Sequence, residues 1–138
     1  MNMQILLPAD GSEHSVRAAE KAIEVAKMFK GRIDVLYVVD GATSKSDVLQ
    51  NVSKFEIERK RKARLQPIED RIIHAGLDYS IIIEHGEPGP TIVEFANRGN
   101  YECVVVGSRG LNKLQTMVLG SVSHKVVKRV ECPVMVIK

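Results

Sequence analysis

The sequence predicts a single α/β domain in which helices cover both faces of an open, five-stranded parallel sheet. Short apolar runs alternate with helical patterns along the whole chain, in the order β-α-β-α-β-α-β-α-β. The runs are apolar at nearly every position, which is typical of parallel strands buried on both faces. Because the 138 residues contain no internal repeat and no linker, we expect one domain over 1–138.

Apolar spacing and two turn signals predict the first strand and the first helix. Met3–Leu7 is an apolar run that ends in the turn Pro8–Gly11, and Ser12 is placed to cap a helix. The inner face of that helix recurs at helical spacing: Val16, Ala19, Ile23, Ala26 and Phe29. Gly31 is expected to end the helix in the position that favours a left-handed glycine.

The middle of the chain predicts two strands around a second helix. Ile33–Val39 is an apolar strand, whereas 41–52 has no hydrophobic period and is expected to be a long, mobile loop. A helix follows over about 53–75, and Gly76 ends it. Its inner face is marked by Ile57, Leu65, Ile68 and Ile72. Tyr79–Glu84, with three consecutive isoleucines, is the third strand.

The last third of the chain predicts two helices and two strands. Pro88–Pro90 opens a short helix, because proline is tolerated in a first turn. Cys103–Val106 is the fourth strand, and the segment 108–119 separates it from a final helix over about 121–130. Val134–Ile137 is the fifth strand, which we expect at an edge of the sheet.

Charge restricts the classes of partner. A formal net charge of +3 is too small to indicate nucleic acid or an acidic membrane as the main partner. The basic run Glu58–Arg64 resembles a nucleic-acid patch, but on a helix its charges surround the axis, so a solvated helix is the favoured interpretation. Glu56 and Glu58 precede Lys60 and Lys62 by four residues, the spacing of helical ion pairs.

The cysteines and histidines predict neither a disulfide nor a metal site. Cys103 and Cys132 lie far apart in apolar surroundings and fit reduced, buried thiols. The histidines lack ligand spacing: His14, His74, His85 and His124. We find neither a signal peptide nor an apolar run of about 18 residues that could span a bilayer, so a cytoplasmic location is expected.

Glycines and serines gather where the fourth strand ends and the last helix begins. The pattern is Gly107-Ser108-Arg109-Gly110, nine residues, then Gly120-Ser121-Val122-Ser123. Ligands of open α/β sheets lie beyond the carboxyl ends of strands, and Gly107 would let a ribose or phosphate approach the backbone there. The N–H groups at the helix start attract anions, and Ser121 and Ser123 can add hydroxyl donors. Taken alone, the glycines fit a purely structural turn and helix cap equally well.

Four segments match one known pattern: Leu7–Ser12, Val104–Gly110, Leu119–Ser123 and Cys132–Val136. With them the chain, from its first strand to its last, resembles the universal stress protein family. The spacing Gly-x2-Gly-x9-Gly-Ser is met in full, and it is the pattern of the ATP-binding branch of that family. Ala9 departs from the more usual threonine or valine, which bears only on one wall of the pocket.

The resemblance implies strand order 3-2-1-4-5, so that Asp10 and Gly107 face each other across the crevice where the order reverses. It implies ATP, or AMP or ADP, as ligand, and Mg or Mn could accompany the phosphates. Pro8, Ala9 and Asp10 would then contact the adenine or ribose, Val39 the adenine edge through its backbone, and Gly107 the ribose. The phosphates would be surrounded by Gly110, Gly120, Ser121, Val122 and Ser123. Ser108 belongs to the same nucleotide-binding signature. Arg109 either reaches a phosphate or is an ordinary exposed charge.

Two functions fit this prediction. The first is a nucleotide-dependent regulatory module in a stress response, in which ATP orders 108–119 and alters a partner or dimer surface. The second is a slow ATPase or ATP-pyrophosphatase-like enzyme, which needs a base near the phosphates. The first is favoured, with no catalytic residue predicted, because Asp10 is the only evident acid and is expected at the nucleoside. A phosphorylated receiver domain is rejected, because Asp10 has no acidic neighbour.

Assembly is a separate expectation. A bare, apolar edge strand invites pairing with another chain. We therefore expect two copies to join antiparallel through Val134–Ile137 as a two-fold homodimer, which the family resemblance also implies.

Overall fold

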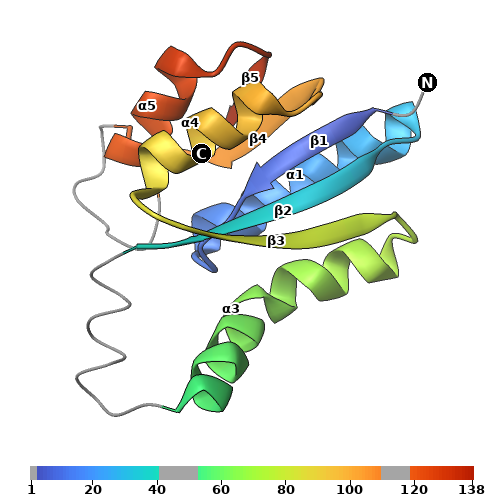
Figure 1. Ribbon diagram of the computed structural model, residues 1–138. Helices are drawn as coiled ribbons and strands as arrows, with labels where there is room; N and C mark the ends of the chain where they lie inside the picture. Colours follow the sequence, from blue (N-terminus) through green and yellow to red (C-terminus); the bar gives the residue numbers. More distant parts are fainter. Residues whose placement is uncertain (1–2, 41–52, 110–118) are drawn as a thin grey trace.

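The computed structural model describes residues 3–40, 53–109 and 119–138. The strands are β1 (Gln4–Pro8), β2 (Arg32–Val39), β3 (Tyr79–His85), β4 (Cys103–Gly107) and β5 (Val134–Ile137). The helices are α1 (Glu13–Phe29), α3 (Lys54–His74), α4 (Pro88–Arg98) and α5 (Ser121–Arg129). The strands pair in parallel in the order β3-β2-β1-β4-β5 (Figure 1). The predicted fold class and strand order are therefore confirmed.

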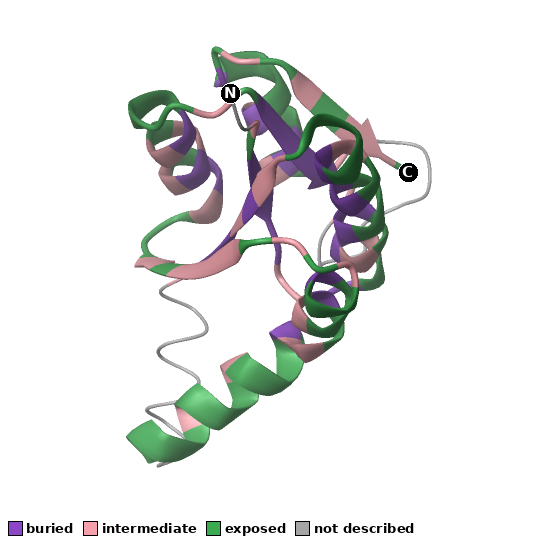
Figure 2. Ribbon diagram, turned by 90° about the vertical axis from the view of Figure 1, so that its right-hand side faces the viewer, coloured by how far each residue is buried: buried purple, intermediate pink, exposed green. Residues whose placement is uncertain are grey.

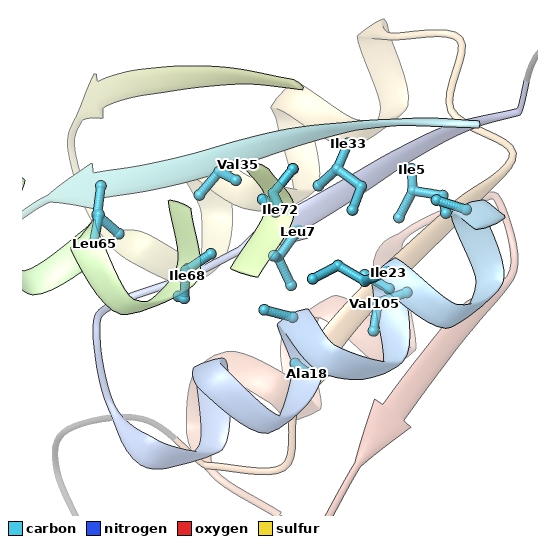
Figure 3. Close-up of a cluster of buried hydrophobic side chains, with 14 of the residues drawn as sticks. Ile5, Leu7, Ala18, Ile23, Ile33, Val35, Leu65, Ile68, Ile72 and Val105 are labelled. Carbon is cyan, nitrogen blue, oxygen red and sulfur yellow. The ribbon is translucent and has the colours of Figure 1, made fainter. Parts of the chain in front are cut away.

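One face of the sheet is covered by α1 and α3, which enclose the larger hydrophobic cluster (Figure 3). The strands contribute fully buried side chains such as Ile5, Leu7 and Val105. The buried side chains of α1 are mostly alanines, which let the helix lie close to the strands: Ala18, Ala19, Ala22 and Ala26. Those of α3 are three of the four predicted residues: Leu65, Ile68 and Ile72.

The opposite face is covered by α4 and α5. Leu6 and Val104, each next in sequence to a residue of the first cluster, pack on this side because successive strand side chains alternate between faces. Ile92 of α4 and Val126 of α5 complete the second cluster. Both faces of the central strands are thus buried, which is why those strands are apolar at nearly every position.

The end of α1 differs from the prediction. The residue with left-handed backbone is Lys30 (φ 51°), and both Lys30 and Gly31 donate their N–H groups to the carbonyl of Ala26. Gly31 is needed for another reason, because a Cβ there would lie 2.5 Å from the carbonyl oxygen of Met3. Phe29, predicted inside, is the last residue of the helix and is 55% exposed.

The first half of α3 extends beyond the sheet and is exposed around most of its circumference (Figure 2). Its first buried residue is Leu65. The predicted exposure of this part of the helix is confirmed, but the predicted ion pairs are not: among the described residues, neither Lys60 nor Lys62 has a carboxylate within 4.0 Å. Exposed pairs gain too little free energy to fix two long side chains.

The β5 strand lies at the edge of the sheet, as predicted, and pairs with β4. Met135 on this strand is 36% exposed, and Val127 on the neighbouring α5 is 45% exposed. In the part of the chain that the structure describes, no helix combines the length and apolar character needed to cross a bilayer.

Candidate functional site

A cavity of about 270 Å³ opens where β1, β2 and β4 end. Its walls come from both helical layers, with Ser15 of α1 and Arg64 of α3 on one side, and Ile92 of α4 and the start of α5 on the other. This is the edge at which open α/β sheets bind ligands, where the strand order reverses between β1 and β4. The volume is close to the lower end of the range for small-molecule sites, roughly 300–1,000 Å³.

Most residues predicted from the sequence line this cavity. From the strand ends come Pro8, Ala9, Asp10, Gly107 and Arg109. From the start of α5 come Gly120, Ser121, Val122 and Ser123. The expectation that Asp10 and Gly107 border one crevice is met.

Three predicted residues are placed differently. Val39 is buried with the α1–α3 cluster, does not line the cavity, and its carbonyl already accepts the N–H of Gly86 at 3.0 Å. Ser108 does not line the cavity either; its N–H donates to Ile137 and its carbonyl accepts the N–H of Gly120. Gly110 lies outside the described residues, as do 41–52 and most of 108–119.

Three of the described helices begin with their first N–H groups capped or absent. Ser12 Oγ accepts the N–H of Ser15 at the start of α1, and Ser53 Oγ accepts that of Glu56 at the start of α3, both at 3.2 Å. In α4 the first helical residue is Pro88, which has no N–H. These helix starts are therefore satisfied within the chain, at least in part.

The α5 helix begins differently. Its N-cap is Gly120, no side chain caps it, and its first turn contains no acidic residue. The first backbone bond across its start runs from the N–H of His124 to the carbonyl of Gly120, at 2.8 Å. The N–H groups of Ser121, Val122 and Ser123 precede that bond, and no hydrogen bond joins them to another described residue. A helix start of this kind, facing a cavity, attracts an anion.

Glycine stands at 107 and at 120, the two described glycines of the motif, for different physical reasons. A Cβ on Gly107 would lie 2.8 Å from the carbonyl oxygen of His14, so this glycine lets the end of β4 pack against α1. A Cβ on Gly120 would meet its nearest atoms, in Ser108 and Arg109, at 3.4 and 3.5 Å, which is ordinary contact. With φ at −59°, the backbone of Gly120 also suits any residue. Packing among the described residues therefore requires glycine at 107 and leaves room for a Cβ at 120.

The hydroxyl of Ser123 has a partner within the protein. Its Oγ donates to the carbonyl of Gly107 at 2.6 Å, and the side chain is 4% exposed. In this structure its one hydrogen ties α5 to the end of β4, so donation to a phosphate stays a prediction that requires this bond to break. The backbone N–H of Ser123 and the exposed hydroxyl of Ser121 remain available.

Charged and polar side chains that the sequence analysis did not assign to a ligand site also line the cavity. Asp40 follows the end of β2, and Tyr37 and Arg64 form part of the α1–α3 side. The position of Asp40 directly after a strand could have indicated it, as it did for Asp10. Nothing in the spacing of α3 marks Arg64, because its place depends on how the helix crosses the sheet. Asp10 accepts the N–H of Ser12 at 2.9 Å, which fixes the turn after β1.

Metal ligands do not cluster in the described part of the chain. No group of three or more histidine, cysteine, aspartate or glutamate side chains there could hold an ion.

Comparison with known proteins places this geometry in a family. The sequence pattern described as the universal stress protein family matches residues 1–138. Universal stress protein MJ0531 of Methanocaldococcus jannaschii is 32% identical over 140 residues, covering 98% of this chain and 81% of that protein. The solved structure of MJ0577 from the same organism has a TM-score of 0.83 and 28% identity, covering 100% of this chain and 96% of the other.

Three further structures share the fold at 21–24% identity, with TM-scores of 0.69–0.71, covering 99–100% of this chain and 91–98% of the other. They are a universal stress protein with cAMP, one from Arabidopsis thaliana with AMP, and one from Archaeoglobus fulgidus with dAMP. The match over the whole sequence, the 32% identity to MJ0531 and the shared topology lead to one conclusion. The chain belongs to the universal stress protein family.

Proposed function

We propose that this protein binds an adenine nucleotide, ATP in the first place, and that the backbone N–H groups at the start of α5 hold its phosphates. The observation that carries the proposal is the uncapped start of α5 at the wall of a cavity, with the N–H groups of Ser121, Val122 and Ser123 preceding the first helical bond. Backbone N–H groups and the helix dipole together favour a polyanion at this position.

The remaining wall suits a nucleoside. Pro8, Ala9 and Ile92 offer apolar surface, and the carboxylates of Asp10 and Asp40 offer hydrogen-bond acceptors. We assign Asp10 to the adenine or ribose and Gly107 to the ribose, as the family resemblance implies. The roles of Val39, Ser108 and Gly110 in binding stay predictions.

Proteins of the same fold support an adenine mononucleotide as the kind of ligand. The three complexes with cAMP, AMP and dAMP place adenine nucleotides in this fold. The preference for ATP rests on the Gly-x2-Gly-x9-Gly-Ser spacing of this chain and on three consecutive N–H groups that can serve more than one phosphate. Mg or Mn would then be carried by the phosphate oxygens.

We further propose that nucleotide binding regulates a partner or a dimer surface in a stress response, with little or slow hydrolysis. The carboxylates at the cavity lie at the nucleoside end in this assignment, so neither is placed to activate water beside the phosphates. The rate of steady-state ATP hydrolysis by the purified protein distinguishes a regulatory module from an enzyme. A turnover number well below about 1 per second fits the regulatory module, and a value of about 1 per second or more identifies an enzyme.

Gly120→Val tests the phosphate assignment. Among the described residues a Cβ at this position makes ordinary contacts, and the backbone conformation is ordinary, so the variant is expected to keep its fold. A branched side chain beside the N–H groups would exclude phosphate oxygens, and isothermal titration should show ATP affinity falling at least about tenfold, or 1.4 kcal/mol. Gly120→Ala has a smaller side chain, so its affinity for ATP should lie between those of the unmodified protein and Gly120→Val. Unchanged affinity in a folded Gly120→Val protein would refute the assignment.

We also propose that the protein is a homodimer through β5. The strand lies at the sheet edge, and the exposed side chains of Met135 and Val127 extend the apolar surface beside it. Light scattering at high micromolar concentration should give twice the mass of the 15.3 kDa chain, and Met135→Lys should shift it toward the monomer. A monomeric mass for the unmodified protein would refute the dimer.

A further inference from the structure

A hydrogen-bonded pair, Arg64 and Tyr37, forms part of the cavity wall on the side of α1 and α3. Arg64 Nη1 donates to the phenol oxygen of Tyr37 at 2.8 Å, and both residues line the cavity. Tyr37 is on β2 and is 5% exposed, whereas Arg64 reaches it from α3. The pair joins two elements at the candidate site. Arg64 ends the basic run Glu58–Arg64, and neither residue belongs to the glycine-serine motif.

The pair carries hydrogen-bond donors at the wall of the cavity. The phenol oxygen uses a lone pair for Arg64, and among the described residues its own hydrogen makes no hydrogen bond. The guanidinium keeps donors beyond the one that binds the phenol, and within the described parts of the chain it makes no other hydrogen bond. A ligand that satisfies this wall must therefore bring acceptors.

The topology indicates which part of a nucleotide reaches the pair. The phosphate-binding N–H groups lie at the start of α5, beside the end of β4. The strand ends then follow in the order β4, β1, β2, with neighbours about 4.8 Å apart. A nucleotide that begins at α5 and crosses these ends places its ribose near β1 and its base near β2, where Tyr37 lies.

We infer that Arg64 and Tyr37 recognise the base of the bound nucleotide by donating hydrogen bonds to ring nitrogens of a purine. The inference rests on the proposed nucleotide site and adds a specificity determinant to it. Tyr37 holds the guanidinium by the 2.8 Å hydrogen bond, and the acceptors on the base would bind the donors that this bond leaves over. Asp10 and Asp40, which are acceptors, would complement the exocyclic amino group of adenine on the same wall.

Variants of the pair test the inference through ATP affinity measured by titration calorimetry. Arg64→Ala should raise the Kd about tenfold, because it removes a charged donor, and Tyr37→Phe about three- to tenfold. Arg64→Lys should recover only part of the loss, since an ammonium cannot reproduce the planar donor set. Arg59→Ala, on the same helix and away from the cavity, is the matched control and should stay within about twofold of the unmodified protein.

Analogues of ATP in which carbon replaces ring nitrogen N1, N3 or N7 distinguish base recognition from a structural role. At least one analogue should bind the unmodified protein about tenfold more weakly than ATP, and that penalty should disappear in Arg64→Ala. An equal penalty in both proteins, or equal ATP affinity of Arg64→Ala and Arg59→Ala, would overturn the inference while leaving the nucleotide site intact. Loss of affinity for inorganic tripolyphosphate in Arg64→Ala would assign Arg64 to the phosphates and also overturn it. No ATP binding by the unmodified protein would overturn the proposed function together with this inference.

Discussion

Replacing Ser123 by alanine should cost stability and leave phosphate binding largely intact. The hydroxyl donates to the Gly107 carbonyl at 2.6 Å and is 4% exposed, so the variant leaves a buried carbonyl without this donor. Loss of such a partner costs about 1–3 kcal/mol, and the better helix propensity of alanine offsets only a few tenths. The unfolding entropy of 138 residues is about 0.3 kcal/mol/K, so the Tm should fall by about 3–10 °C.

Ser121→Ala is the matched control, because its hydroxyl is exposed at the start of the same helix. Its stability should stay within about 0.5 kcal/mol of the unmodified protein, whereas its ATP affinity should fall if the hydroxyl contacts a phosphate. Differential scanning calorimetry and ATP titration of both variants measure the two effects separately. An unchanged Tm for Ser123→Ala together with a loss of ATP affinity would refute the structural role and restore that hydroxyl to the phosphates.

Three further predictions concern the fold. Lys30→Gly should raise the free energy of unfolding by up to about 1 kcal/mol in urea titrations, because lysine is held in left-handed backbone there; a loss of stability would contradict this. Leu7→Ala should lower it by about 2–5 kcal/mol, because the side chain is fully buried, and a change below 1 kcal/mol would show a loosely packed core. Burial, and then the hydrogen bond to Asp34, raise the pKa of Tyr101 above its usual 10. The raised pKa contributes to the free energy of unfolding below pH 10, and this contribution is lost as the pH rises above 10. Tyr101→Phe should therefore flatten the alkaline decrease of the urea midpoint, and identical pH profiles of the two proteins would contradict this.

The sequence predicted the sheet and its helices because local signals and burial agree in this chain. Runs such as Ile33–Val39 are buried on both faces, and Gly76 ends α3 with φ at +72° and no neighbour within 4 Å of a Cβ placed there. The sequence did not predict why position 31 is glycine. The reason is the close approach of the Met3 carbonyl, and spacing along the chain contains no information on such a contact.

The candidate site shows the same division. Residues beside strand ends and helix starts, such as Asp10 and Gly120, could be predicted because the fold brings those ends together. The bond from Ser123 to Gly107 and the reach of Arg64 to Tyr37 depend on side-chain directions across separate elements. Neither direction follows from the sequence pattern, so the sequence analysis missed both the bond from Ser123 to Gly107 and the place of Arg64 at the cavity.

The most direct measurement of the central claim follows the backbone N–H signals of Ser121, Val122 and Ser123 by two-dimensional NMR during an ATP titration. If these N–H groups hold the phosphates, their signals should shift more than those of other residues and saturate with the same Kd as the calorimetric titration. In Gly120→Val, the same signals should not shift when ATP is added. Saturable ATP binding that shifts other regions and leaves these three signals unchanged would contradict the account.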